Sequence, residues 1–377
     1  MKMKKTFAMI LASVMMMGAL AGCGSKEEPQ TETTPDAQVE EQAGDKQEST
    51  LNVGVFYYNF ADAYITTVRT AMDAKLDAAG IQYKNYDGQT NQAQQLDQVN
   101  TAIVDGANLL VVNIVETSSP DAAQQVVEAA KGADIPVIFF NREVQDDVIN
   151  SYDKCAFVGT DAPEAGHMQG EMIGDFLLEN YEATDLNGDG TISYVMFKGQ
   201  EGNNEAEYRT QYAVEDANKK LTEAGKPELK FYDENNASKY LVDPNGAWSA
   251  QAATDYMNTI LAGNTEANGN MVELVIANND GMAEGAVAAL QQAGYNTGNE
   301  GDKTIPVYGV DAMESALQKI EKGQMTGTVK QDGPAMAATI MTLVENVGNG
   351  ASVMDNTASY NVKDGVAKIM VPYAKMS

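Results

Sequence analysis

Two polar residues stand where buried strands are expected to end, and they are the first candidates for ligand contacts. The stretch Ile135-Pro-Val-Ile-Phe-Phe-Asn141 runs apolar or β-favouring residues into an asparagine, and Ile305-Pro-Val-Tyr-Gly-Val-Asp311 repeats the pattern with an aspartate. Such runs are typical of buried parallel strands. Because open parallel sheets bind ligands at the carboxyl ends of their strands, the pair predicts two similar α/β lobes that face one shared ligand.

The motifs that most enzymes need at such an edge are missing from the sequence. A dinucleotide site needs a glycine-rich turn after the first strand, but residues 53–60 carry bulky aromatics there, and no Walker-type phosphate loop is present. The one histidine, His167, lies in a predicted helix, where a single histidine is more often structural than catalytic. Paired carboxylates are expected on the surface of so acidic a chain. The sequence therefore favours binding without catalysis.

One loop, residues 185–193, has the spacing of a calcium site. Oxygen-bearing side chains occupy positions one, three, five and nine, and a glycine stands at position six, as in the first part of an EF-hand loop. Position twelve, which normally supplies a bidentate acid, is Met196. The loop alone leaves two interpretations open, a calcium site completed from elsewhere or an acidic surface turn. The candidate ligands in the loop are Asp185, Asn187, Asp189, Thr191 and Ser193.

Strands and helices must position these residues, and their patterns alternate along the chain in the same order twice. This alternation predicts an α/β fold with a doubly wound parallel sheet in each lobe. Residues 333–377, a helix followed by short strand-like pieces, are expected to cross back and complete the lobes. The predicted strands are 51–58, 82–86, 108–115, 135–141 and 156–159 in the first half, and 192–197, 229–232, 273–277, 305–310 and 327–329 in the second.

The amino terminus has the features of an export signal. Three lysines among the first five residues precede the apolar run 7–17, and Leu20-Ala-Gly-Cys23 resembles the lipobox of bacterial lipoproteins. This implies a signal peptide over residues 1–22 and a lipid on Cys23. An ordinary secretory signal or a membrane anchor is the alternative, although the run is short for a span. Residues 23–50 are then a lipidated cysteine and a disordered acidic linker, and Cys155 has no disulfide partner.

Composition narrows the class of partner. The chain has 377 residues, of which 44% are hydrophobic, enough for two domains with separate cores. It contains 25 basic and 54 acidic residues, a net charge of -29, and we find no basic patch in the sequence. A nucleic acid is not expected as a partner, because its phosphates would be repelled by this charge.

Taken together, several pieces of the sequence resemble one known family. Over residues 51–377 the chain is similar to the galactose/glucose-binding proteins, the periplasmic-type sugar receptors of ABC importers. The resemblance implies the type I periplasmic binding protein fold, with two lobes joined by a hinge. It implies an N-terminal lobe of residues 51–160 plus about 333–369, and a C-terminal lobe of residues 161–332 plus about 370–377. The matching pieces are 135–143, 151–154, 158–161, 185–190, 275–280 and 305–312.

The resemblance also implies which residues contact a sugar. The rings of Tyr64 and Trp248 would enclose a pyranose, and charged or amide groups would bind its hydroxyls. A core position is the alternative for Trp248, but its setting after a Pro-Asn turn favours an exposed loop in the cleft. Asn203, Glu205 and Gln331 replace a histidine, an aspartate and an asparagine of the family, and the added reach of the last two is expected to alter sugar preference. The implied ligand residues are Asp62, Tyr64, Asn141, Asn203, Glu205, Arg209, Trp248, Asn279, Asp311 and Gln331.

The family also brings the missing calcium ligand from a distant strand, here Glu273. The implied cofactor is therefore Ca²⁺, in a site that Ser193, in place of a longer amide, is expected to weaken.

The sequence thus predicts a lipid-anchored, extracytoplasmic receptor that closes on a hexose, galactose or glucose, and presents it to the membrane subunits of an ABC permease. We expect a monomer, and the resemblance leaves a chemoreceptor open as a further partner. The alternatives are a receptor for a pentose or another small sugar-like ligand, a sugar- or nucleoside-active enzyme on the same fold, and the effector core of a repressor. The missing catalytic motifs disfavour the enzyme. The lipobox and the absence of a basic helix-turn-helix disfavour the repressor.

Overall fold

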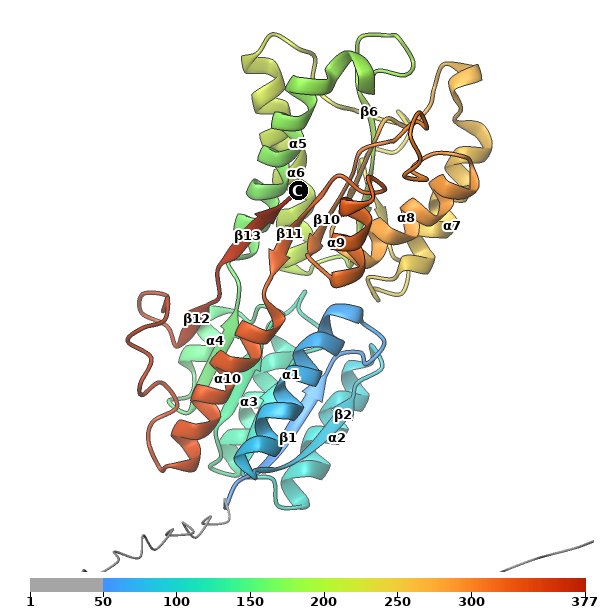
Figure 1. Ribbon diagram of the computed structural model, residues 1–377. Helices are drawn as coiled ribbons and strands as arrows, with labels where there is room; N and C mark the ends of the chain where they lie inside the picture. Colours follow the sequence, from blue (N-terminus) through green and yellow to red (C-terminus); the bar gives the residue numbers. More distant parts are fainter. Residues whose placement is uncertain (1–49) are drawn as a thin grey trace, which may run out of the picture. The chain divides into compact units, whose positions relative to one another are not determined.

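The computed structural model describes residues 50–377, and the statements below refer to that range. It contains two β-sheets, each with helices on both faces (Figure 1). The predicted signal peptide, the lipidated Cys23 and nearly all of the predicted linker lie outside the described residues. No helix of residues 50–377 combines the length and the apolar character that a membrane span requires.

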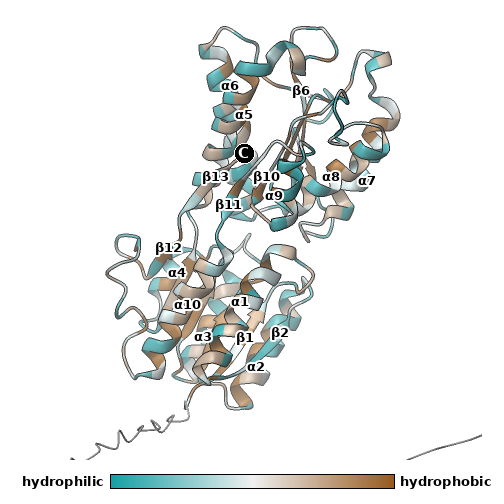
Figure 2. Ribbon diagram, in the orientation of Figure 1, coloured by the Kyte–Doolittle hydropathy of each residue, from teal (hydrophilic) through white to brown (hydrophobic). Residues whose placement is uncertain are grey.

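The first lobe is built from β1 (Asn52–Tyr57), α1 (Ala63–Ala79), β2 (Gln82–Asp87), α2 (Gln92–Val104), β3 (Leu109–Val112), α3 (Asp121–Gly132), β4 (Val137–Phe140), α4 (Asp146–Asn150), β5 (Cys155–Gly159), α10 (Gly333–Gly348) and β12 (Lys368–Met370). Its sheet is parallel throughout, in the order β12-β5-β4-β3-β1-β2. Successive residues of a strand face opposite sides. Val55 therefore packs with α1 and α10, which lie side by side in Figure 1, and Phe56 packs with α2 and α3. The hydrophilic edge strand β2 is teal in Figure 2.

The second lobe is built from α5 (Ala162–Thr184), β6 (Ser193–Lys198), α6 (Asn204–Glu223), β7 (Lys230–Phe231), β8 (Leu241–Val242), α7 (Ala250–Gly263), the 3₁₀ helix η1 (Glu266–Asn268), β9 (Leu274–Ala277), α8 (Asp280–Gln292), β10 (Val307–Asp311), α9 (Glu314–Glu321), β11 (Gly327–Gln331) and β13 (Tyr373–Met376). Its strand order is β13-β11-β10-β9-β6-β7, and β8 also pairs with β6. A close approach fixes α6 against α5, because a Cβ on Gly166 would lie 2.5 Å from the Tyr208 carbonyl oxygen. This contact positions α6, which carries two residues of the site.

The prediction of two doubly wound α/β lobes is confirmed, and a strand forms in each of the ten predicted segments. Two details differ. The strand expected over 135–141 is limited to β4, because Pro136 has no N–H to donate and Asn141 adopts a φ of 62°. The edge strand β13 runs antiparallel to β11, whereas the rest of that sheet is parallel.

Within residues 50–377 the chain passes between the two lobes at three places. It leaves the first lobe after β5, returns to it between β11 and α10, and leaves again between β12 and β13. Thr160, Asp332 and Pro372 lie in these three segments.

Candidate functional site

One pocket lies where strands of both sheets reach their carboxyl ends, and it has an empty volume of about 360 Å³. All ten residues predicted as ligand contacts line it, together with two that the sequence analysis missed, Tyr58 and Arg142. The lining residues are Tyr58, Asp62, Tyr64, Asn141 and Arg142 from the first lobe, and Asn203, Glu205, Arg209, Trp248, Asn279, Asp311 and Gln331 from the second.

Helix capping holds three of these side chains. Asp62, Asn203 and Asn279 are the N-caps of α1, α6 and α8, and each side-chain oxygen accepts a hydrogen bond at 2.8 to 3.0 Å from the amide three residues ahead. The Asn279 amide group also donates to the carbonyl oxygen of Trp248 at 3.1 Å. Because caps restrict side-chain rotation before any ligand arrives, these polar groups are preorganised.

Three pocket residues have backbone conformations that non-glycine residues rarely adopt. Asn141, Trp248 and Asp311 have φ values of 62°, 56° and 124°. Such conformations cost about 1 to 3 kcal/mol each and persist only where the surroundings hold them. Asn113 provides one such contact, since its side-chain amide donates to Asn141 Oδ1 at 3.1 Å. These are three of the ten non-glycine residues with a positive φ in the part of the chain that the structure describes.

Three carboxylates face the pocket, and burial raises the pKa of each. The Asp280 carboxylate raises the pKa of Asp311 further, and the Glu143 carboxylate raises the pKa of Glu205 further. Burial is also the largest influence on the pKa of Asp62, which it raises. A hydrogen bond from the Tyr58 hydroxyl, at 2.5 Å, lowers that pKa in part. The pocket thus concentrates acceptors with little water around them.

Arg209 supplies positive charge from α6. Its guanidinium donates to the Asn278 carbonyl oxygen at 2.9 Å, to Gln331 Oε1 at 3.1 Å and to the Tyr373 hydroxyl at 2.9 Å. Burial lowers the pKa of Arg209, but the opposing effects of Tyr373 and Asp311 are together stronger and raise it overall. All three acceptors are neutral, so none of them pairs the positive charge of the guanidinium.

Arg142, which follows Asn141, was missed by the sequence analysis. Its guanidinium lies 4.1 Å from the centroid of the Tyr58 ring and donates to Gln200 of the other lobe. No ion pair joins Arg142 or Arg209 to a carboxylate in the part of the chain that the structure covers. Within that part, Nε of both arginines and Oε2 of Glu205 have no hydrogen-bond partner. Free donors and acceptors side by side suit a neutral ligand whose hydroxyls both donate and accept.

Two aromatic rings add apolar surface. Tyr64 is buried, and its hydroxyl donates to the sulfur of Met336 at 3.8 Å. Trp248 is partly buried, and one side of its ring lies against Gly199, where a Cβ would approach to 2.1 Å. Trp248 therefore lies in the pocket and is not part of the core of its own lobe.

Comparison with known proteins shows which family shares this architecture. The family model of the periplasmic binding protein domain matches residues 53–352. This chain belongs to the periplasmic binding protein family. A relative confirms the resemblance seen in the sequence. It is the D-galactose/methyl-galactoside binding periplasmic protein MglB of Haemophilus influenzae. The two are 34% identical over 85% of this chain and 88% of that protein.

More distant members of the family extend the comparison. The D-xylose-binding periplasmic protein of Escherichia coli is 24% identical to this periplasmic binding protein over 75% of this chain and 73% of that one. A solved structure of an ABC transporter solute binding protein from Bacillus halodurans, with bound myo-inositol, has a TM-score of 0.66 and 23% identity over 88% of this chain and 95% of that one. This likeness shows the shared fold.

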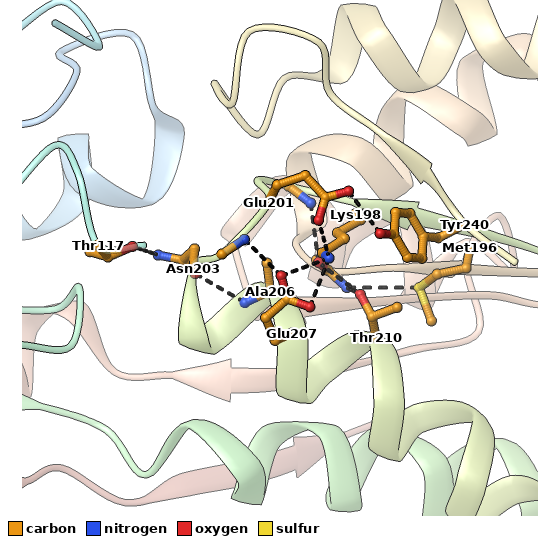
Figure 3. Close-up of polar contacts among 12 residues, drawn as sticks. Thr117, Met196, Lys198, Glu201, Asn203, Ala206, Glu207, Thr210 and Tyr240 are labelled. Atoms are coloured by element: carbon orange, nitrogen blue, oxygen red, sulfur yellow. Dashed lines mark hydrogen bonds and ion pairs between the residues drawn. The ribbon is translucent and has the colours of Figure 1, made fainter. Parts of the chain in front are cut away.

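The three departures from the family pattern make protein contacts in this periplasmic binding protein. Figure 3 shows Asn203 extended toward Thr117 of the first lobe, whose hydroxyl oxygen accepts a hydrogen bond from Asn203 Nδ2 at 3.3 Å. Glu205 Oε1 accepts from the Glu143 amide at 3.0 Å, again across the lobes. Gln331 accepts from Arg209. The longer side chains of Glu205 and Gln331 therefore contact the protein itself, and one oxygen of Glu205 remains free in the pocket.

The predicted calcium residues come together, although Glu273 is far from the loop in sequence. Its carboxylate is fully buried and accepts from the amides of Asn187 and Ser193, both at 2.8 Å. The Asp185 carboxylate accepts from loop amides, including that of Gly190 at 2.9 Å. The Asn187 oxygen accepts from the Met271 amide, and Thr191 donates its own amide to Asp189.

These oxygens are turned toward amides, and no cluster of three or more His, Cys, Asp or Glu is arranged to hold a metal within residues 50–377. Burial raises the pKa of Glu273, and the Asp185 carboxylate acts in the same direction. No lysine or arginine forms an ion pair with either acid in that range. Glu273 is thus a buried carboxylate near a second one, without a basic partner in that range, and backbone amides occupy its oxygens.

Proposed function

We propose that this periplasmic binding protein captures a hexose, galactose or glucose, between its lobes and delivers it to an ABC permease, without catalysing a reaction. The observation that carries the proposal is a pocket in which three carboxylates and two guanidinium groups lie beside Tyr64 and Trp248, with Glu205 Oε2 and both arginine Nε atoms free of hydrogen-bond partners within the described residues. A pyranose offers apolar C–H faces for the rings and hydroxyls for both kinds of charge. The identity to MglB of Haemophilus influenzae supports the choice of a hexose.

A pentose is the second candidate ligand. Glu205 and Gln331 are each one methylene longer than the residues we expected from the family, and the free oxygen of Glu205 would occupy space in the pocket that a smaller sugar does not need. The D-xylose-binding relative supports this alternative within the same family. Binding of either ligand from both lobes would favour closure.

Titration of the purified protein tests the proposal. We expect calorimetry to give micromolar or tighter binding of glucose or galactose, about -8 kcal/mol or better, and solution scattering to show compaction. Trp248, the one tryptophan of the chain, should change its fluorescence. Ribose, xylose and arabinose serve as the comparison set. If only a pentose binds, the hexose assignment is wrong, and if none of the five sugars binds, both the hexose and the pentose assignments are wrong.

We also propose Ca²⁺ as a structural ligand of the 185–193 loop, with Asp185, Asn187, Asp189, Thr191, Ser193 and Glu273 as the residues that would hold it. The support is the sequence spacing and the buried Glu273 carboxylate beside the loop. When bound, the ion would neutralise the acids and tie the loop to the segment that precedes β9.

We further propose an extracytoplasmic location and a lipid anchor on Cys23, supported by the Leu-Ala-Gly-Cys pattern and by the family. Cys23→Ala should then move the protein from the membrane fraction to the soluble fraction, and a variant that stays membrane-bound would exclude this anchor. The proposal also includes a monomeric state and a chemoreceptor as a further partner.

A further inference from the structure

The turn after β10 carries two consecutive strained residues, and one of them faces the pocket. Asp311 has a φ of 124° and Ala312 a φ of 54°, so two successive non-glycine residues lie in the region that favours glycine. Asp311 is also a lining residue of the pocket. A turn of this kind keeps its shape only where other groups hold it. The holding groups therefore decide where the Asp311 carboxylate points.

A second carboxylate, which does not line the pocket, holds this turn. Asp280 is the first residue of α8 and is fully buried. Its Oδ2 accepts a hydrogen bond from the Met313 amide at 2.7 Å, and its Oδ1 accepts from the Thr328 hydroxyl at 2.6 Å. Gly309 leaves the space for this carboxylate, since a Cβ there would lie 2.3 Å from Asp280 Oδ1. Asp280 therefore fixes the residue that follows the two strained ones.

The direction of the hydrogen bonds requires an acceptor at this position. The Met313 amide can only donate. The Thr328 hydroxyl oxygen already accepts from the Ala312 amide at 3.3 Å, so its proton is free to go to Asp280. An ionised carboxylate accepts from both groups, whereas the amide of an asparagine can accept at one oxygen only. The site thus distinguishes aspartate from asparagine, although the two have nearly the same shape.

We propose that Asp280 is a positioning residue for ligand recognition: it locks the 311–313 turn from β10 and so aims the Asp311 carboxylate into the pocket. This inference rests on the proposed receptor function and deepens it. Asp280 would act through Asp311: it does not line the pocket, its carboxylate holds the turn, and its charge and backbone amide act directly on the Asp311 carboxyl. Its other charged neighbours are Glu284, on the next turn of α8, and Lys319 of α9, which lies 3.7 Å from Glu284.

A double-mutant cycle with Trp248 fluorescence and the sugar that binds the wild type tests this role. We expect Asp280→Asn to weaken binding at least tenfold in the wild-type background and less than twofold in an Asp311→Ala background, because the group being aimed is then absent. An independent structural effect would weaken binding by the same factor in both backgrounds and would overturn the inference. An Asp280→Asn protein that binds as well as the wild type would overturn it too.

Thr328 offers a second pair of variants if Asp280→Asn does not fold. Thr328→Val removes the hydroxyl that joins Asp280 to the turn, and Thr328→Ser keeps it. We expect weaker binding in the valine variant and near wild-type binding in the serine variant, with equal weakening in both as the contrary result. A wild type that binds no sugar would refute the proposed function and this inference together. A binding wild type with unaffected variants would refute the inference alone.

Discussion

At the scale of residues, pocket side chains that are proposed to bind the ligand also hold the fold. Asp62 uses Oδ1 to cap α1 and Oδ2 to accept from the Tyr58 hydroxyl. Asn279 caps α8 and holds the backbone of Trp248. These double roles fix the polar groups before a ligand binds, which lowers the entropy that binding must overcome. They also mean that an alanine variant changes folding and binding together.

A pair of variants can separate the two roles of Asp62. Asp62→Asn keeps an oxygen for the cap but loses the charge, so we expect unchanged stability within about 0.5 kcal/mol, because asparagine caps as well as aspartate does. Sugar binding should weaken by about 2 kcal/mol, since a charged acceptor is lost. Asp62→Ala should weaken binding at least as much and also destabilise the protein by about 1 kcal/mol. Denaturant unfolding and calorimetry check this, and equal stability of the two variants would argue against the cap.

The residues that the sequence analysis missed show what a linear pattern does not contain. Tyr58 belongs to an aromatic run that also suits a buried strand, and Arg142 is like any polar residue after a strand end. Their place in the pocket depends on contacts between distant segments, such as that of Arg142 with Gln200. The position of Asn141 at the end of β4, in contrast, was predictable, because the apolar run before it is local information.

At the scale of elements, the turn from β6 into α6 is organised by a buried lysine. Lys198 lies 2.7 Å from both Glu201 and Glu207, and its ammonium is 4.3 Å from the centroid of the Tyr240 ring (Figure 3). Glu207 also accepts from the Gly202 amide at 2.7 Å. The network thus fixes the turn immediately before Asn203 and Glu205, which face the first lobe.

We expect Lys198→Met to destabilise the protein by about 1 to 2 kcal/mol. The methionine keeps the apolar stem, but the two charge-assisted hydrogen bonds are lost. The half-exposed glutamates can rehydrate, so the loss should stay below that of a fully buried pair. Lys230→Met is a matched control, because its ion pair with Glu234 is exposed and should contribute less than about 1 kcal/mol. Equal unfolding free energies for the two variants would remove Lys198 from this role.

The calcium loop makes a prediction at the same scale. If Ca²⁺ binds only the folded protein, removing it with a chelator should lower the melting temperature, and excess calcium should restore it. Glu273→Gln should abolish most of this difference, because it removes the charge of the buried carboxylate. A melting curve that does not respond to chelator or calcium would exclude the ion. The loop spacing was readable in the sequence, but the partner 80 residues away from Ser193 was not, and it entered through the family resemblance.

The order of strands shows the same division between local and distant information. Apolar runs predicted where the parallel strands lie, because each run is a property of its own segment. They did not predict that β13 runs antiparallel. The expectation that the chain changes lobe near residue 370, where Val371 and Pro372 separate β12 from β13, came from the family resemblance. Strand direction at a sheet edge is decided by the neighbouring strand and not by the short strand itself.

At the scale of the whole molecule, one hydrogen-bond network joins the pocket to all three passages between the lobes. Arg209 donates to Gln331, which stands at the second passage, and to Tyr373, which stands just after the third. Thr160, at the first passage, is 2.7 Å from the Tyr373 hydroxyl and 3.4 Å from the Gln331 amide. A ligand that contacts Arg209 would therefore act on the segments about which the lobes turn.

Charge at this scale predicts opposite pH dependences for stability and for binding. Burial raises the pKa of Asp62, Glu205 and Asp311, and it raises that of Asp280 to about 7. The carboxyls of the unfolded chain have pKa values of about 4. At mildly acidic pH the folded protein therefore binds protons that the unfolded chain does not bind. Stability should then rise as the pH falls from 8 to about 5. The net charge of -29 acts in the same direction, because protonation relieves repulsion.

Melting temperatures of the sugar-free protein across this pH range test the prediction, and two comparisons assign the cause. Added salt at about 0.5 M should suppress the part due to overall repulsion but not the part due to buried acids. Asp280→Asn should flatten the slope near pH 7, since it removes the group that titrates there. Below about pH 4, stability should fall again as ion-paired acids become protonated. Asp146 is an example: burial raises its pKa, but Lys363 and Lys368 together lower it more strongly. Sugar affinity should decrease on acidification over the whole range, because protonated carboxyls are weaker acceptors. A melting temperature that falls steadily from pH 8 to 5 would show that the buried acids are not held in this way.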